Sequence, residues 1–263
     1  MGIKIKKERF SMKRIIAIIV CVVILGAQIG VYSAWTAEED GYETRYYPQL
    51  YKLQSLKVIP KDDGHTATSF VTRREVIEVA YTLYFAGRPR KSSKDDYLAA
   101  EWIDVSPNTY DAYILHNVYQ LGFFTGKTDE NGNLYADLDS YVTCEEAVLI
   151  MLRTLNCHNF PIEYKNFDVY IEKYAEEKGW LENKILLFAQ ECGLINYTAL
   201  YDDRVFMVPF LDLQKATEPM MFVHFVGVID RALYMPIWNA FHGPEPSYLI
   251  DQLTESAKYY DEE

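Results

Sequence analysis

The sequence predicts a mainly α-helical protein in which three helix-loop-helix repeats follow an apolar N-terminal helix. Two observations indicate this fold class. Residues 15–32 form an apolar run without a charged residue, and a single helix-start pattern recurs three times farther along the chain. The pattern contains Thr72, Thr143 and Thr217, which are 71 and 74 residues apart. Repeats of similar length are typical of helical units that bury their apolar faces against one another.

The first 34 residues have the organisation of an export segment. A basic stretch precedes the apolar run, as in secretory signal peptides, and the run of 18 residues also suits a short membrane anchor with its N-terminus inside. We therefore expect a signal peptide or signal anchor at 1–34, a linker at 35–49 and an extracytoplasmic chain beyond. The basic residues of the stretch are Lys4, Lys6, Lys7, Arg9, Lys13 and Arg14.

The part of the chain after residue 34 is strongly acidic. It contains 20 basic and 37 acidic residues, a formal charge near −17. Such a charge repels nucleic acid, so we expect no nucleic-acid partner. The same part has three cysteines, Cys144, Cys157 and Cys192. This odd number does not form a complete disulfide framework, and we expect reduced, buried thiols.

Each repeat is expected to begin its second helix at the recurring threonine. Thr72 with Glu75, and Thr143 with Glu146, have the spacing of a capping box, in which each side chain bonds the other residue's backbone amide. Apolar residues then follow at intervals of three and four, which predicts one buried helix face. The third copy begins at Thr217 and carries Pro219 in the expected first turn, where proline is tolerated.

A second recurring element is a helix stop ahead of each loop. Gly122 and Gly193 end apolar-patterned segments, as glycine does where a left-handed conformation is needed, and Lys57 stands at the matching position of the first copy. Keeping that conformation with lysine costs about 1 kcal/mol. The resulting repeats span 50–87, 97–156 and 165–234, with a C-terminal tail at 235–263.

The sequence shows no signature of catalysis, of a metal site or of a cofactor site. Its serines lie outside any nucleophile-elbow pattern, and its histidines and cysteines lack zinc-ligand spacing. Asp129, Asn131 and Asn133 alternate as calcium ligands do, but Leu134 stands where an EF-hand needs glycine, so a plain turn is preferred. His224 lies among apolar residues and is interpreted as a core histidine. A wall-active enzyme is therefore the least favoured class.

Three motifs in order resemble the S-layer homology repeat. Trp102 and Asp104 lie in a segment similar to the opening of that repeat, and the segment from Gly122 to Gly126 resembles its Gly-Ile-Ile-x-Gly motif. The Thr72-Arg73-Arg74-Glu75 sequence resembles its Thr-Arg-Ala-Glu helix start. The resemblance covers roughly residues 50 to 234, with the second repeat the clearest copy.

This resemblance implies three pseudo-symmetric repeats around a central three-helix bundle. It also implies that grooves between the repeats bind a pyruvylated secondary cell-wall polysaccharide, with the helix-start arginine holding the anionic group. That role passes to Arg73 in the first copy and falls on Cys144 and Glu218 in the others, which departs from the family pattern. The implied ligand-binding residues are Arg73, Thr72, Glu75, Trp102, Asp104, Gly122, Gly126, Thr143 and Glu146.

Two functions from different classes follow. The leading hypothesis is a non-catalytic cell-envelope module that binds wall polysaccharide and is secreted to the wall, or anchored in the membrane, of a Gram-positive-type bacterium. The alternative is a membrane-tethered protein-interaction or structural module that has lost the sugar site. Arg73 distinguishes them, because it is either a ligand contact or part of the solvated surface. The capping residues serve the fold in either case.

Overall fold

A computed structural model describes residues 39–61, 64–86, 102–159, 164–201, 204–237 and 247–260. Contacts within the chain group its residues into two compact units, Met1–Arg45 and Tyr46–Glu263. The fold described below is that of the second unit. The predicted signal segment at 1–34 lies outside the described residues, as does most of the connector after the first repeat. Within these ranges no helix combines the length and the apolar composition needed to cross a membrane.

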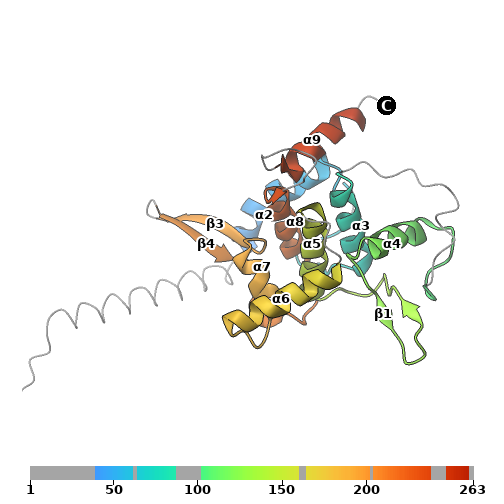
Figure 1. The fold of residues 1–263 in the computed structure, drawn as a ribbon. Helices are drawn as coiled ribbons and strands as arrows, with labels where there is room; N and C mark the ends of the chain where they lie inside the picture. The colour runs from blue at the N-terminus through green and yellow to red at the C-terminus, as the bar shows by residue number, and fades with distance from the viewer. Residues whose placement is uncertain are drawn as a thin grey trace, which may run out of the picture. The chain divides into compact units, whose positions relative to one another are not determined.

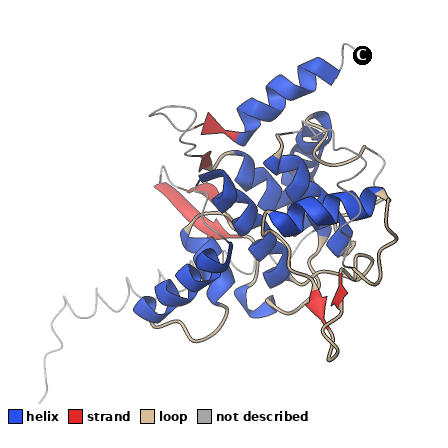
Figure 2. Cartoon of the chain, turned by 45° about the vertical axis from the view of Figure 1, so that its right-hand side comes forward, coloured by secondary structure: helices blue, strands red, loops and turns tan. Residues whose placement is uncertain are grey.

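The fold is mainly α-helical, as the sequence predicted (Figure 1). The described residues contain eight α-helices and three antiparallel two-stranded sheets, which Figure 2 shows in blue and red. The helices are α2 (Glu39–Ser55), α3 (Arg73–Tyr84), α4 (Tyr110–Gln120), α5 (Cys144–Asn159), α6 (Tyr164–Lys178), α7 (Lys184–Glu191), α8 (Phe222–Leu233) and α9 (Leu249–Tyr260), with a 3-10 turn η2 (Leu213–Lys215). The strand pairs are β1 (Lys127–Thr128) with β2 (Leu134–Tyr135), β3 (Asn196–Tyr201) with β4 (Arg204–Pro209), and β5 (Pro236–Ile237) with β6 (Ser247–Tyr248).

Helix α5 lies at the centre of the core and contacts both α3 and α8. The apolar spacing seen in the sequence explains this position, because Val148, Met151 and Leu152 repeat on one face of α5 and are buried. Helix α8 is buried on most of its circumference, with Phe225, Val226 and other residues fully inside. Helices α4 and α6 lie outside this core, against α3 and α5 respectively.

Two of the three predicted helix starts are confirmed. Thr72 caps α3 and forms the complete capping box with Glu75. Thr143 precedes α5, and its hydroxyl accepts a hydrogen bond from the Glu146 amide at 3.2 Å. The start expected at Thr217 is wrong, because α8 begins at Phe222 after an N-cap residue, Met221, that makes no side-chain cap.

The segments ahead of α3, α5 and α8 are joined by a cycle of backbone hydrogen bonds. The Val71 amide donates to the Met220 carbonyl at 2.9 Å, the Met220 amide to Val142 at 2.9 Å, and the Val142 amide to Val71 at 3.0 Å. All three side chains are fully buried. Each segment thus bonds both others, and the three helices begin around one common centre.

The same cycle satisfies the first amides of the three helices. The amides of Arg73, Cys144 and Phe222 donate to carbonyls in the loop of a neighbouring segment, at 2.9, 2.9 and 2.7 Å. These orphan donors of a helix N-terminus therefore find tertiary partners. The bonds also make Phe222 the counterpart of Arg73 in the third segment, where the sequence comparison had placed Glu218.

The predicted helix stops are confirmed for all three copies. Lys57, Gly122 and Gly193 have φ values of 58°, 76° and 80°. In each case the next amide bonds back to a carbonyl five residues earlier, from Val58 to Leu53, Phe123 to Val118 and Leu194 to Ala189. This is the Schellman geometry, and it directs an apolar residue from each stop into the core.

Replacing Lys57 by glycine is expected to stabilise the protein by about 0.5–1 kcal/mol, because Lys57 holds a left-handed conformation that favours glycine. The midpoint of urea unfolding should rise. Lys57→Ala is the matched control, since it removes the lysine side chain but keeps the Cβ. An equal gain from both substitutions would contradict the conformational explanation.

Three regions differ from the sequence expectations. Residues 39–49, expected as part of a linker, belong to α2. The tail contains α9, whose Leu249 and Leu253 are fully buried and whose Ser256 hydroxyl donates to the Ala86 carbonyl at 2.7 Å. Of the two cysteines whose side chains are described, Cys144 is a buried free thiol, whereas Cys192 is free but exposed.

Candidate functional site

The opening motif of the second repeat forms a packed aromatic platform. Trp102 is 5% exposed and stacks on Phe124, with ring centroids 5.6 Å apart. Gly126 lies beneath the indole, where an added Cβ would come within 2.2 Å of Trp102 and 2.7 Å of the Tyr135 carbonyl oxygen. Gly122 is the buried stop of α4 described above. Trp102 and Gly126 thus form part of this platform, and Gly122 ends the helix that precedes Phe124.

Asp104 positions the loop that follows β2. Its carboxylate accepts hydrogen bonds from the amides of Ala136 and Asp137, at 2.9 and 2.6 Å. Asp137 has a φ of 51°, a left-handed conformation that aspartate tolerates better than most residues. The loop thereby presents the Asp137 carboxyl toward the start of α3.

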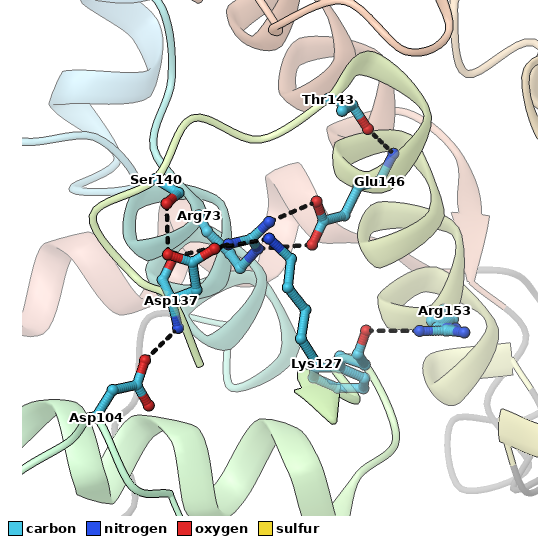
Figure 3. A network of polar contacts seen from close by, with 9 residues as sticks. Arg73, Asp104, Lys127, Asp137, Ser140, Thr143, Glu146 and Arg153 are labelled. Atoms are coloured by element: carbon cyan, nitrogen blue, oxygen red, sulfur yellow. Dashed lines mark hydrogen bonds and ion pairs between the residues drawn. The ribbon is translucent and has the colours of Figure 1, made fainter. Parts of the chain in front are cut away.

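Arg73 lies at the meeting point of the first and second repeats (Figure 3). Its Nε and Nη2 atoms donate to the two oxygens of Glu146 at 2.7 and 3.0 Å, a bidentate pair. Its Nη1 donates to the Asp137 carbonyl oxygen at 2.7 Å and lies 3.0 Å from the Asp137 carboxylate. The side chain is only 3% exposed. The predicted ligand-binding arginine is thus a buried bridge between repeats.

The carboxylates around Arg73 balance its charge. Burial alone lowers the pKa of Arg73, but hydrogen bonds and charge from Glu146 and Asp137 raise the pKa above its usual value overall. The pKa of Asp137 falls to about 2, chiefly because Lys127 and Ser140 donate hydrogen bonds to its carboxylate. Arg73 and Asp137 are therefore both charged at neutral pH.

The remaining capping residues are also engaged within the protein. Glu75 accepts from the Thr72 amide and hydroxyl at 2.7 and 2.8 Å, and it pairs with His65. The His65 ring stacks on Phe222, with centroids 4.5 Å apart. Glu75 is thus connected to the start of α8 through His65. At the start of α5, the Thr143 hydroxyl accepts a hydrogen bond from the Glu146 amide, which is one of the two bonds of the expected capping box. The Glu146 carboxylate accepts hydrogen bonds from Arg73.

A polar cavity of about 460 Å³ opens beside this network. The starts of α3 and α4, the segment after Trp102 and the loop at 137–140 all contribute to it. Of the nine predicted site residues, Asp104 is the one that lines the cavity. The lining residues are Arg74, Asp104, Val105, Ser106, Thr109, Asp111, Asp137, Leu138, Asp139 and Ser140.

Arg74 supplies the accessible cationic group of this cavity. Its guanidinium contacts Asp111 and Asp139, and its side chain is 32% exposed against 88% for Asp139. The exposed Asp139 pair is weak because water screens it, so a ligand oxygen can compete with it for the guanidinium. Hydroxyls of Ser106, Thr109 and Ser140 add donors and acceptors. This chemistry suits a hydroxylated ligand such as a sugar.

The calcium alternative for the hairpin between β1 and β2 is not supported by its geometry. The Asp129 carboxylate accepts from the Asn131 and Asn133 amides and from the Asn133 side chain, each at 2.8 Å. Hydrogen bonds from Asn133 lower the pKa of Asp129. The aspartate thus closes a turn. Within the described ranges, no three His, Cys, Asp or Glu side chains converge to hold a metal ion.

His224, in the first turn of α8, has the properties of a core histidine. Burial is the main cause that lowers its pKa to about 4, with Lys215 contributing in the same direction. The ring is therefore neutral at physiological pH. It has no role in the cavity described above.

Lowering the pH from 7 to 5 should destabilise the folded chain through His224. The unfolded residue binds a proton near pH 6.5, whereas the folded residue does so near pH 4, so the unfolded chain binds more protons between these values. The expected loss is about 2 kcal/mol by pH 5. In the His224→Gln variant, this pH-dependent loss should be absent from the free energies of urea unfolding measured between pH 7 and pH 5. Parallel pH curves for the two proteins would contradict the assignment.

Several residues of the site could not be selected from the sequence. Asp137 contacts Arg73, and Lys127 contacts Asp137, only through the packing of segments far apart in the chain. Arg74 was not selected beside Arg73. The sequence carried one signal that could have directed attention to these residues, namely the polar loop that precedes each helix start. Comparison with family models, curated proteins and solved structures finds no match to this chain.

Proposed function

We propose that the chain is a non-catalytic module of three S-layer-homology-like repeats that acts outside the cytoplasm at the cell envelope. The observation that carries this proposal is the backbone cycle through Val71, Val142 and Met220, because it relates three helix starts in the manner that a pseudo-threefold repeat module requires. The matching helix stops at Lys57, Gly122 and Gly193 add independent support. Helices α3, α5 and α8 would be the central three-helix bundle.

The ligand of this module is a wall polysaccharide held in the cavity around Arg74 and Asp104. The buried Arg73 does not serve as the anion-binding group in this proposal, since Glu146 and Asp137 occupy its donors. The cavity offers Arg74 among four aspartates, so it favours neutral sugar hydroxyls over the pyruvylated groups that the family resemblance implied. Carboxylates accept hydrogen bonds from such hydroxyls, and a guanidinium donates hydrogen bonds to them.

Co-sedimentation with isolated cell-wall sacculi tests this function. The detergent-solubilised full-length chain is expected to sediment with the walls, and Arg74→Ala and Asp104→Asn should reduce the bound fraction several-fold. Lys184→Ala, which removes a similar surface charge on α7, is the control and should bind as the parent does. Sedimentation that is unaffected by the cavity variants would place the sugar elsewhere, and a lack of sedimentation would eliminate wall binding.

A second function is favoured by one specific observation. The positions equivalent to Arg73 are Cys144 and Phe222, so the described helix starts have no exposed arginine at this position. A membrane-tethered protein-interaction or structural module that keeps the three-repeat fold without sugar binding agrees with this pattern. It predicts that the full-length chain remains membrane-bound through residues 15–32 while failing to sediment with walls. Clearing of peptidoglycan in a zymogram would argue for an enzyme instead.

A further inference from the structure

Helix α2 has an aromatic outer face that the rest of the described fold leaves uncovered. On its inner side Tyr46, Leu50 and Leu53 are buried. On its outer side Tyr47 and Tyr51 are 42% and 64% exposed, one helical turn apart, and their rings stack with centroids 6.1 Å apart. A solvated helix face normally carries charged groups, so two stacked tyrosines indicate a surface with a partner.

Tyr234, just after α8, extends this face. It is 48% exposed, and the Lys52 ammonium lies 3.1 Å from its hydroxyl and 4.8 Å from its ring centroid. Lys52 also pairs with Asp230, so this lysine is held against the protein. We name Tyr47, Tyr51 and Tyr234 the tyrosine face. The sequence from Tyr46 to Lys61 contains no acidic residue, although the protein has 38 of them.

The position of α2 in the chain indicates which partner the tyrosine face meets. The apolar run ends at Tyr32 and α2 begins at Glu39. The six intervening residues span about 20 Å at most when fully extended. If the run is held in a bilayer, α2 therefore begins close to the bilayer surface. The chain length outside the described fold favours a lipid surface over a distant partner.

We propose that the tyrosine face of α2 lies in the headgroup layer of the bilayer that holds residues 15–32. The inference rests on the attachment to a membrane through residues 15–32 that the second proposed function includes. Tyrosine is enriched at membrane interfaces because its ring is apolar and its hydroxyl remains hydrated. Charge attraction is not the cause, since Glu38, Glu39, Asp40 and Glu43 lie between the run and the face. A zwitterionic surface is the expected partner.

Photolabelling of the full-length chain in phosphatidylcholine vesicles tests this placement. The vesicles carry a phospholipid with a diazirine near its headgroup, and labelled peptides are mapped by mass spectrometry. We expect lipid adducts in residues 15–32 and in the peptide that contains Tyr47 and Tyr51. The variant Tyr47→Ser/Tyr51→Ser should lower the α2 adducts several-fold. Tyr110→Ser/Tyr170→Ser removes two exposed tyrosines elsewhere and should leave them unchanged.

The possible failures are distinguishable. Adducts in residues 15–32 without adducts in α2 would overturn the inference and leave membrane attachment standing. Adducts in neither region would overturn both, and intact mass would verify that the N-terminal segment was present. Chain-to-chain cross-links from a photoactivatable residue at position 51, in place of lipid adducts, would assign the tyrosine face to a second copy and also overturn the proposal.

Discussion

Arg73→Ala is expected to destabilise the protein by about 3–4 kcal/mol. Its guanidinium is 3% exposed, and its removal takes the bidentate cationic partner from Glu146 and leaves Asp137 with Lys127 alone. Breaking one side of a buried ion pair usually costs about 3–5 kcal/mol. The lower part of that range applies because the two carboxylates are each about one third exposed. Urea unfolding of the detergent-solubilised chain measures the loss.

Arg74→Ala is the matched control for this measurement. The two arginines are adjacent and each contacts two aspartates or glutamates, but Arg74 is 32% exposed and one of its partners, Asp139, is 88% exposed. Exposed ion pairs contribute about 0–1 kcal/mol, so this variant should remain close to the parent in stability. Equal losses from the two substitutions would contradict the structural role of Arg73. The pair also separates folding from binding, since Arg74→Ala is the variant expected to lose wall sedimentation.

Gly126→Ala is expected to cost about 3–4 kcal/mol as well, for a steric reason. The new Cβ would lie 2.2 Å from a carbon of the buried Trp102 ring and 2.7 Å from the Tyr135 carbonyl oxygen. Overpacking of this kind costs about 1–3 kcal/mol, and alanine at the observed φ of 68° adds about 1 kcal/mol. Trp102 or the backbone at Tyr135 must shift to relieve this clash, so the fluorescence of the folded state should change along with the unfolding midpoint.

Gly132→Ala isolates the conformational part of this effect. Gly132 has a φ of 82°, yet no atom lies within 4 Å of the position its Cβ would occupy. The expected loss of stability is about 1 kcal/mol, which is the free energy of the left-handed backbone conformation alone. If Gly132→Ala were as destabilising as Gly126→Ala, the close approach of Trp102 would not be the cause.

Features set by local chemistry could be predicted from the sequence. Thr72 and Glu75 form their capping box from neighbouring atoms, and Gly122 and Gly193 end helices through their own backbone freedom. Lys57 was identified as the helix stop of the first copy because its flanking residues follow the same pattern as those around Gly122 and Gly193. Such features depend on about six consecutive residues, which a sequence pattern contains in full.

Features set by packing between repeats could not be predicted in this way. Met221 makes no side-chain cap at α8, and the amides of Phe222 and Val223 donate instead to the carbonyls of Ser69 and Ala67 in the first repeat. A search for a threonine and a glutamate three residues apart therefore had nothing to detect at the true start. Thr217 matched the pattern only in residue type, and the helix start predicted there was wrong.

The site residues also divide into features that neighbouring residues determine and features that depend on packing between distant segments. The residue types around Arg73 suggested an exposed anion-binding group, whereas its burial depends on Glu146, which lies 73 residues away. The cavity beside Arg74 likewise combines four separate segments of chain. Asp104, which the sequence suggested, lines that cavity, although its two amide hydrogen bonds depend on a loop 32 and 33 residues farther on.

The backbone cycle makes the segments ahead of α3, α5 and α8 depend on one another. In an open solenoid, a repeat can be duplicated or deleted because each unit contacts only its neighbours. Here the Val71 amide, near the beginning, needs the Met220 carbonyl, near the end, and Met220 needs Val142. Loss of the third segment would remove the partners of the Val71 amide and the Val142 carbonyl, and also those of the Cys144 and Glu145 amides. The three segments therefore depend on one another, and the chain must be synthesised past residue 220 before this cycle can close.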